Sequence, residues 1–279
     1  MEIIGPGGLS MPKLGFGTWQ MSGRECRHSV EQALALGYRH IDTAEMYGNE
    51  EAIGGALSGC GLPREEIFLA SKVWHDHLEP AVLRRSCHAS LRRLRTDYLD
   101  LYLIHWPAPG MNLRAALEAM MRLKDEGKIR HLGVSNFTVA LMREAVEGIG
   151  AAIACNQVEY HVLLDQGAVL DFARAHGIAV SAYRPLAEGR LGEFPELVRI
   201  AAKHGASVQQ IALKWLLDQE MVAAIPKAAH EAHQKANLAA LSITLDDEDR
   251  RVIAALPKDQ RLVDPSFSPS WDPPRARAA

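Results

Sequence analysis

Short apolar segments alternate with amphipathic segments along nearly the whole chain of 279 residues. The apolar segments have strand-like length and composition, whereas the others repeat apolar residues at helical spacing. The predicted strands cover 13–18, 40–43, 67–73, 99–106, 131–135, 152–158, 179–183 and 222–226. The predicted helices cover 27–36, 50–57, 80–94, 113–125, 139–147, 168–175, 208–217 and 230–241. Eight strand-then-helix units predict an α/β fold, a closed (β/α)8 TIM barrel whose buried parallel strands read as continuous apolar runs.

Three further elements are expected around this barrel. A helix over 195–203 precedes the seventh unit's helix, another over 246–256 follows the eighth, and 2–10 forms an N-terminal β-hairpin across the barrel floor. No Pro/Gly/Ser-rich linker divides the chain, so we expect a single domain over 1–279. The segment 264–279 contains four prolines and many small residues, which predicts a poorly ordered tail.

Bulk properties favour a small-molecule ligand. The formal net charge is only −3, which gives no electrostatic reason to expect nucleic acid or a membrane as partner. The first residues lack a signal-peptide pattern, and no apolar run is long enough to span a bilayer. The four cysteines are widely separated with no CxxC pair, which favours reduced thiols over disulfides or zinc ligands. We therefore expect a soluble cytoplasmic protein. We also expect it to act as a monomer.

Ionisable side chains stand where predicted strands end. Asp42, Lys72 and His105 lie at such ends, and Tyr47 follows in the next loop. The same holds for a second, mostly polar set: Ser135, Asn136, Gln157, Tyr183 and Lys227. Functional groups of (β/α)8 barrels gather at the carboxyl ends of the strands, so we expect both sets to surround one pocket.

The first set suits proton chemistry. A phenol with a pKa near 10 needs a neighbouring cation before Tyr47 can act as a general acid, and Lys72 can supply that charge. Asp42 would orient this Lys and keep it protonated, while His105 would direct a ring N–H at a substrate carbonyl oxygen. Singly, each has an ordinary explanation as a cap, a loop aromatic, a surface cation or a core histidine. Together at strand ends of one barrel, they indicate a catalytic site.

Seven ordered motifs give the chain a resemblance to a known family. They are Gly15-Phe16-Gly17-Thr18-Trp19, Asp42-Thr43-Ala44 with Tyr47-Gly48-Asn49-Glu50, Ser71-Lys72, Leu103-Ile104-His105-Trp106-Pro107, Gly133-Val134-Ser135-Asn136-Phe137, Asn156-Gln157-Val158-Glu159-Tyr160 and Ile225-Pro226-Lys227. The sequence resembles the aldo-keto reductases, and within them it is most similar to bacterial 2,5-diketo-D-gluconate reductases. The resemblance implies an NADP-dependent oxidoreductase with Asp42, Tyr47, Lys72 and His105 as its catalytic tetrad.

Three tryptophans at strand ends predict an apolar, water-excluding substrate pocket. The predicted substrate-binding residues are Trp19, Tyr47, Trp74, His105 and Trp106. The loop after Pro107 is short, so we expect an open pocket that accepts small aldehydes and ketones, such as methylglyoxal or diketo-sugar acids. Arg261 has two interpretations, a partner for a substrate carboxylate or a solvated surface residue.

The resemblance also implies where NADP(H), with NAD(H) as a usable alternative, would bind. The Gly15-x-Gly17 pattern lacks the third glycine of a Rossmann fingerprint, so that signal is rejected. The residues implied instead are Gly17, Thr18, Trp19, Asp42, Ser135, Asn136, Gln157, Tyr183, Arg184, Pro185, Leu186, Gly189, Ile225, Lys227, Ala228, His233 and Asn237.

Several positions depart from the family's cofactor pattern. Arg184 replaces the usual Ser after the stacking Tyr, so its guanidinium either binds pyrophosphate or points to solvent. Lys227 keeps the cation for the 2′-phosphate, but Ala228 and His233 replace a Ser and an Arg that bind this phosphate in relatives. We therefore expect NADPH to be preferred over NADH by a reduced margin.

The sequence leaves two other functions open. His75, His77, His105 and Asp42 suggest a metal-dependent hydrolase, although Lys72 beside them would repel a dication. A binding protein without turnover is the other alternative, against which the intact tetrad argues.

Overall fold

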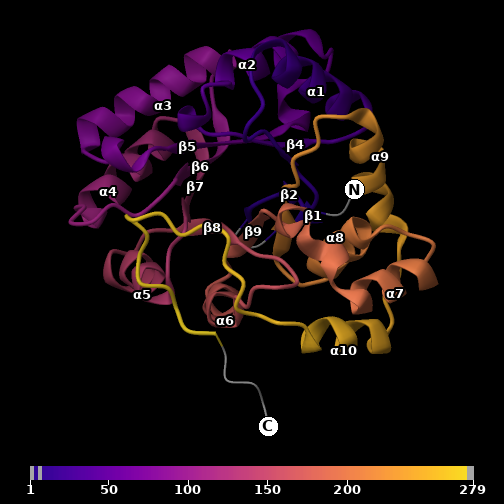
Figure 1. Cartoon of the computed structure of the whole chain (residues 1–279). Coiled ribbons are helices and arrows are strands. Elements are labelled where there is room, and N and C mark those ends of the chain that lie inside the picture. Colours follow the sequence, from indigo (N-terminus) through magenta and orange to yellow (C-terminus); the bar gives the residue numbers. More distant parts are fainter. Residues whose placement is uncertain (1–2, 6–7, 275–279) are drawn as a thin grey trace.

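The centre of the molecule is a curled sheet of eight parallel strands (Figure 1). The structure is a computed structural model that describes residues 3–5 and 8–274. The strand order is β10-β9-β8-β7-β6-β5-β4-β3, so every strand lies beside its neighbour in sequence. The strands are β3 (Phe16–Gly17), β4 (His40–Asp42), β5 (Phe68–Val73), β6 (Leu99–Ile104), β7 (Ile129–Ser135), β8 (Ile153–Glu159), β9 (Ala179–Tyr183) and β10 (Val222–Ala224).

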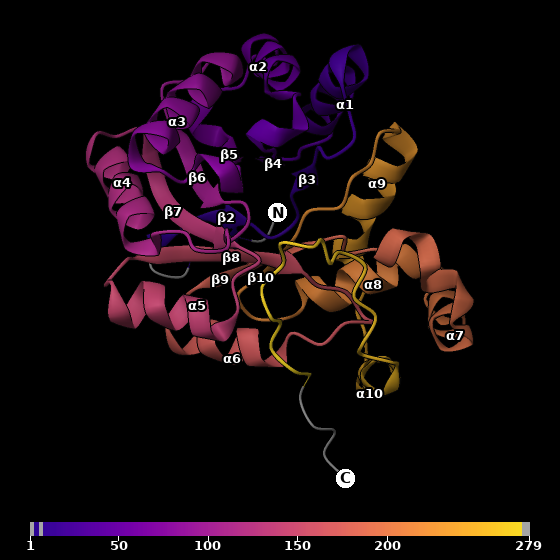
Figure 2. The same cartoon turned by 60° about the vertical axis from the view of Figure 1, so that its left-hand side comes forward.

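Helices cover the outer side of this sheet (Figure 2). They are α1 (Gly23–Ala35), α2 (Glu50–Gly59), α3 (Pro80–Leu94), α4 (Leu113–Asp125), α5 (Val139–Arg143), α6 (Gly167–Ala175), α7 (Pro195–Lys203), α8 (Val208–Leu217), α9 (Glu231–Ala239) and α10 (Asp247–Ala255). Of these, α3, α4, α7 and α8 have the predicted bounds. Local sequence signals explain why the first residues of some helices could be predicted. Pro80 occupies the first turn of α3, and Ser207 with Gln210 forms a capping box at the start of α8.

Other predicted elements differ in their bounds, such as the helix 27–36, which begins earlier as α1 at Gly23. The expected strand 13–18 is regular only at Phe16–Gly17. The expected helix 139–147 is divided into two elements. Its first part is α5, and its second part is a π-helical turn, Glu144–Gly148, which has wider hydrogen-bonded rings. The expected helix 230–241 ends as α9 at Ala239 and continues as a 3-10 turn. Each difference lies at an element end, where sequence patterns are least specific.

The first and last strands of the sheet approach each other closely. The Gly15 N–H donates to the Ala224 oxygen at 2.8 Å, and the Ala224 N–H donates to the Lys13 oxygen at 2.7 Å. A Cβ atom at Gly17 would lie 2.5 Å from the Ile225 carbonyl oxygen, so only glycine fits here. The two edges of the sheet are therefore hydrogen-bonded to one another.

The N-terminal segment lies at the amino ends of the strands. Strand β1 (Ile3–Ile4) pairs antiparallel with β2 (Met11–Pro12), while residues 2, 6 and 7 of the expected hairpin 2–10 lie outside the described residues. Leu9 and Met11 are buried among inward-facing residues of the sheet. The interior is thus filled at this end, which leaves the carboxyl ends of the strands for a site.

The described part of the expected tail 264–279 makes contacts with the rest of the chain. Residues 264–274 run back past the sheet from α10, in yellow in Figure 1. The Val139 N–H donates to Asp272 Oδ2 at 2.9 Å, and the Phe267 ring lies edge-on to Trp106 at 5.5 Å. The described part of this proline-containing segment thus has aromatic and hydrogen-bonding partners elsewhere in the chain. Residues 275–279 lie outside the described residues.

Candidate active site

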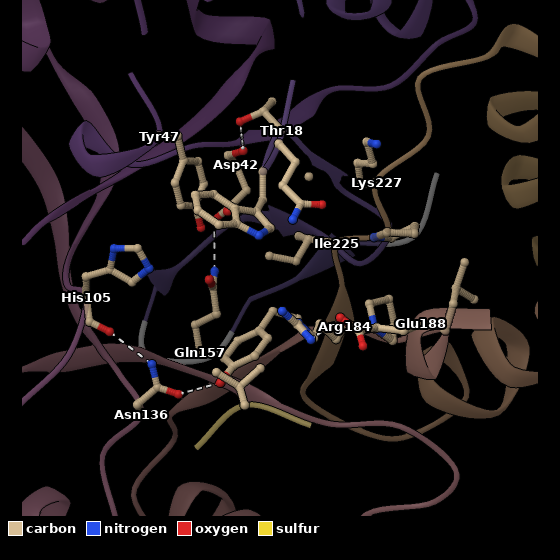
Figure 3. Close-up of a pocket in the computed structure, with 18 of the residues that line it drawn as sticks. Thr18, Asp42, Tyr47, His105, Asn136, Gln157, Arg184, Glu188, Ile225 and Lys227 are labelled. Carbon is tan, nitrogen blue, oxygen red and sulfur yellow. Dashed lines mark hydrogen bonds and ion pairs between the residues drawn. The ribbon is translucent and has the colours of Figure 1, made fainter. Parts of the chain in front are cut away.

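Four side chains from three strand ends meet at the carboxyl end of the sheet. Asp42 is the last residue of β4, and Tyr47 ends the 3-10 turn Glu45–Tyr47 that follows. Lys72 lies in β5, and His105 directly follows β6. Figure 3 shows Asp42, Tyr47 and His105 around the same cavity. The parallel arrangement brings together residues that are far apart in sequence.

The Lys72 ammonium is fully buried and has three oxygen neighbours. Its Nζ donates to Asp42 Oδ1 at 2.6 Å, to the Thr43 carbonyl at 2.8 Å and to the Tyr47 hydroxyl at 3.4 Å. Burial opposes its charge, but attraction to Asp42 and these hydrogen bonds outweigh burial and raise the pKa of Lys72 above its ordinary value. Lys72 is therefore a fixed cation beside the phenol.

The Tyr47 hydroxyl oxygen accepts a hydrogen bond from Lys72 Nζ, so the proton of the Tyr47 O–H points away from Lys72. Burial raises the pKa of Tyr47, and the Lys72 cation opposes this shift without reversing it. The phenol is thus protonated at neutral pH, with a cation in place to stabilise the phenolate once its proton leaves. That combination is what a general acid requires.

His105 lies beside Tyr47 as a neutral imidazole. Burial, followed by the charge of Lys72 and by His75, holds the pKa of His105 well below its ordinary value. Its ring centroid is 5.6 Å from that of Tyr47. In the described part of the chain its buried Nδ1 has no hydrogen-bond partner, which favours placing the single ring proton on Nε2, because an unpaired donor is costlier than an unpaired acceptor.

Two amide side chains brace the site from the opposite strands. Gln157 Nε2 donates to Asp42 Oδ2 at 2.8 Å, so both oxygens of this carboxylate are engaged. Asn136 Nδ2 donates to the His105 carbonyl at 3.0 Å, and Asn136 Oδ1 accepts from the Tyr183 hydroxyl at 2.8 Å. Figure 3 draws these contacts as dashed lines. They hold Asp42 and the chain at His105 in fixed orientations.

A cavity of about 390 Å³ opens over these groups. Its lining residues are Gly17, Thr18, Trp19, Gln20, Asp42, Met46, Tyr47, His105, Trp106, Asn136, Gln157, Tyr183, Arg184, Pro185, Leu186, Glu188, Gly189, Ile225, Pro226, Lys227 and Val263. At one side Arg184 forms an ion pair with Glu188. The volume is that of a small-molecule site.

Comparison with known proteins identifies the family. A model of the aldo/keto reductase family matches residues 13–257. This chain belongs to the aldo/keto reductases. The methylglyoxal reductase DkgB of Salmonella typhi is 40% identical over 268 residues, covering 95% of this chain and 100% of the relative. The glyoxal reductase of Bacillus subtilis strain 168 is 40% identical over 256 residues, covering 91% and 92%.

The fold comparison agrees with the family assignment. A crystal structure provisionally named 2,5-diketo-D-gluconic acid reductase B has a TM-score of 0.95 and 40% sequence identity. The match covers 98% of each chain. The resemblance inferred from the motifs, both to the aldo-keto reductases and to the diketogluconate reductases within them, is confirmed.

Most residues that the sequence assigned to a cofactor line the cavity of this aldo/keto reductase. Ser135, Ala228, His233 and Asn237 are the exceptions. Ser135 is buried beneath it and accepts from Asn136 Nδ2, and Ala228 and Asn237 are also buried. His233 lies in the first turn of α9 beside His230. Of the substrate set, only Trp74 does not line the cavity, and its ring packs against His105 at 5.1 Å.

The lining of the reductase fits a nicotinamide dinucleotide. Tyr183 offers a ring face, Asn136 and Gln157 offer amides, and Arg184 and Lys227 offer cations along the same cavity. Lys227 forms no ion pair with any described residue, so its charge is available to an anionic ligand. An aromatic ring can stack on a nicotinamide ring, amides can hydrogen-bond its carboxamide, and cations can pair with its phosphates.

Other sites considered from the sequence find less support. Within residues 3–5 and 8–274, no group of three or more His, Cys, Asp and Glu side chains is placed to hold a metal ion. His75 instead pairs with Asp76, and His77 pairs with Glu45. All four cysteines are free thiols. No described helix is long and apolar enough to cross a membrane.

Several residues that shape the site were not predicted from sequence. Met46, Glu188 and Val263 line the cavity. Glu159 is fully buried and accepts hydrogen bonds from the backbone N–H groups of Leu262 and Val263. Glu159 carried a usable signal, since an acidic residue at the end of a buried strand must find partners. No sequence signal marked Val263, because its position in the cavity wall depends on the path of the C-terminal segment.

Proposed function

We propose that this aldo/keto reductase reduces small aldehydes and ketones to alcohols, with NADP(H) as its preferred cofactor and NAD(H) as a usable one. The observation that carries the proposal is the position of Lys72, whose ammonium donates to both Asp42 and the Tyr47 hydroxyl. This contact gives a phenol the cation it needs to act as an acid, beside a neutral imidazole in an open cavity.

The nicotinamide would supply the hydride that forms the new C–H bond at the carbonyl carbon. The Tyr47 O–H donates its proton to the carbonyl oxygen, and Lys72 stabilises the phenolate that remains. His105 donates its ring N–H to the same oxygen, where a single such donor contributes about 3 kcal/mol. Tyr47 regains a proton from solvent, which the cavity admits.

The chain's own residues account for cofactor binding in this proposal. Asn136 and Gln157 would hold the carboxamide, the Tyr183 ring would stack on the nicotinamide, and Arg184 and Lys227 would pair with phosphates. Ser135 would act through Asn136, to which it is hydrogen-bonded.

The preference for NADPH rests on Lys227, which lines the cavity. His233 stands where the resemblance implies an Arg, and an imidazole cannot bind a phosphate bidentately as a guanidinium does. We therefore expect NADPH to bind more tightly than NADH by a reduced margin, and His233→Arg to widen the ratio of their dissociation constants. An unchanged ratio in His233→Arg would exclude position 233 from phosphate recognition.

The scaffold proposed for the reductase is the closed (β/α)8 barrel with an N-terminal hairpin. It is supported by the hydrogen bonds that join the Lys13 to Gly17 segment to 224–227. A monomeric state and a cytoplasmic location are also part of the proposal, the second supported by four free thiols. Size-exclusion chromatography with light scattering tests the first of these two.

The function is tested by the loss of 340 nm absorbance when purified protein is given NADPH, or separately NADH, and a panel of carbonyl compounds. Methylglyoxal, glyoxal and a diketo-sugar acid belong in the panel because similar proteins are named for them. We expect turnover that survives a metal chelator. Cofactor binding without turnover of any compound would instead indicate a binding protein.

A further inference from the structure

Tyr47 is carried by a single 3-10 turn, Glu45–Tyr47, which lies between β4 and α2. The flanks of this turn are anchored, because Thr43 and Asn49 donate hydrogen bonds of 3.0 and 2.9 Å to main-chain carbonyls of other segments. The turn itself is too short to hold its shape through internal hydrogen bonds, which are weaker in 3-10 geometry. The exact position of Tyr47 therefore also depends on contacts that the side chains of the turn make.

Glu45 makes such a contact through its carboxylate. Glu45 Oε1 accepts a hydrogen bond from the Trp74 backbone N–H at 2.6 Å and lies 3.0 Å from His77 Nδ1. The Glu45 side chain is 9% exposed. Its neighbours Met46 and Tyr47 line the cavity, whereas Glu45 does not. Hydrogen bonds to a carboxylate are about twice as strong as neutral ones, so this carboxylate is a strong tie to protein groups and not to a ligand.

The tie joins the phenol to the strand of its cation. Trp74 comes two residues after Lys72, just past the end of β5, so the turn of Tyr47 is fastened to that strand. Two protein oxygens hold Lys72 Nζ at 2.6 and 2.8 Å. The third contact of Nζ, to the Tyr47 hydroxyl, is 3.4 Å long and lies near the limit for a hydrogen bond. A small outward movement of the turn would break it.

Resting on the function proposed above, we infer that Glu45 is a positioning residue for the proton transfer from Tyr47. Its carboxylate keeps the phenol within hydrogen-bonding distance of Lys72 and touches neither substrate nor cofactor. His77 supports the same carboxylate oxygen. What matters in this role is the reach of the side chain to the Trp74 N–H, and not its charge.

Three substitutions at Glu45 separate reach from charge. Glu45→Gln loses the charge but keeps an oxygen that can accept from the Trp74 N–H. Glu45→Asp keeps the charge but is one methylene shorter, and Glu45→Ala loses both. Asp76→Ala is the matched control, because it removes one negative charge from the loop after β5, where Asp76 is exposed and pairs with His75.

Rates give the first readout, with the carbonyl compound of the panel that the wild type reduces fastest. We expect Glu45→Asp and Glu45→Ala to lower kcat about tenfold or more, because a displaced phenol transfers its proton poorly. The KM for NADPH and the dissociation constant for NADP⁺ should stay within about twofold, because the cavity lining is unchanged. Glu45→Gln and Asp76→Ala should keep kcat within about threefold of the wild type.

The pH profile of the reverse reaction gives the second readout. To oxidise the corresponding alcohol with NADP⁺, Tyr47 must accept a proton, so kcat/KM should rise with pH as Tyr47 ionises. The Tyr47 hydroxyl faces Lys72, with the charge of Asp42 and the ring of His105 nearby. Moving the phenol away from the cation raises its pKa.

The midpoint of this profile should therefore rise by about half a pH unit or more in Glu45→Asp and Glu45→Ala. In Glu45→Gln and Asp76→Ala it should stay within about 0.2 pH unit of the wild type. A smaller fraction of folded protein lowers the rate without moving the midpoint, so the profile distinguishes positioning from a loss of stability. If Glu45→Ala does not fold, Glu45→Asp decides.

An unchanged midpoint in Glu45→Asp would overturn the inference, whatever the fall in kcat. A midpoint that moves down in Glu45→Gln would also overturn it, because the charge of Glu45 would then act on the phenol directly. If the wild type reduces no compound of the panel with NADPH or NADH, the proposed function itself fails. Turnover that does not respond to the Glu45 variants counts against this inference alone.

Discussion

The buried carboxylate of Glu159 accepts a hydrogen bond from the Val263 backbone N–H at 2.8 Å and so ties the end of β8 to the C-terminal segment. Its other oxygen accepts from the Leu262 N–H at 2.7 Å and lies 3.0 Å from His161 Nε2. Since Val263 lines the cavity, Glu159 controls the wall of the pocket without touching a ligand.

Glu159→Gln should loosen the C-terminal segment. A Gln amide presents one donor group toward backbone N–H donors, so one of them loses its acceptor, at a cost of about 1–3 kcal/mol. We expect faster hydrogen exchange at residues 262–264, faster proteolysis within 264–274, and a raised KM with a smaller change in kcat. Glu220→Gln, at an exposed position, is the control. Unchanged exchange would show that the segment is held by its aromatic contacts alone.

Lys72→Met should abolish turnover and lower stability. The Met side chain cannot donate to the buried Asp42 carboxylate, which keeps Gln157 as its side-chain donor. Breaking a buried ion pair typically lowers the free energy of unfolding by about 3–5 kcal/mol. Adding Asp42→Asn removes the uncompensated charge, so the double variant should recover part of that loss while remaining inactive. Urea denaturation of the wild type, Lys72→Met, Asp42→Asn and the double variant measures this. A double variant less stable than Lys72→Met would contradict the ion-pair account.

The contact between Arg184 and Glu188 should weaken cofactor binding. Both side chains line the cavity. Glu188 forms an ion pair with the Arg184 guanidinium and would compete with a ligand phosphate for it. We expect Glu188→Gln to tighten NADP⁺ binding about threefold or more and Arg184→Ala to weaken it. In the Arg184→Ala background, Glu188→Gln should have a smaller effect. Fluorescence titration gives the four dissociation constants, and strict additivity would mean that the pair plays no part in binding.

Stability should fall in mild acid because of His105. Burial holds the pKa of His105 well below 6.5, so the unfolded chain binds a proton that the folded protein does not. The free energy of unfolding therefore declines as the pH drops below about 6.5, by at most about 1.4 kcal/mol per pH unit for this group. His105→Gln should show a shallower slope between pH 7 and 5. A slope equal to that of the wild type would indicate that His105 is not desolvated in solution.

The residues whose positions sequence patterns predicted best lie at strand ends. Asp42, Lys72 and His105 come at or just after buried apolar runs, and parallel strands bring such positions to one side of a sheet. Helix bounds were readable where caps mark them, as at Pro80 and Ser207. These are local signals, and the fold preserves them.

What sequence patterns missed depends on contacts between distant segments. The composition of residues 264–274 suggests disorder. The rings of Phe267 and Trp271 nevertheless pack against Trp106, which is distant in sequence. Glu188 enters the cavity because Ala187 and Glu188 adopt left-handed backbone conformations that nothing in their residue types demands. Neither outcome could be derived without the three-dimensional path of the chain.

The most direct test of the catalytic account is a comparison of Tyr47→Phe with the wild type in two measurements, turnover of a carbonyl substrate and the dissociation constant for NADP⁺. The change removes one hydroxyl, and with it the proposed proton donor and the oxygen that accepts a hydrogen bond from Lys72. We predict turnover below about one hundredth of the wild-type rate, with NADP⁺ affinity within about twofold, as expected for loss of a general acid. Turnover above about a tenth of the wild-type rate would contradict the assignment of Tyr47 as the proton donor.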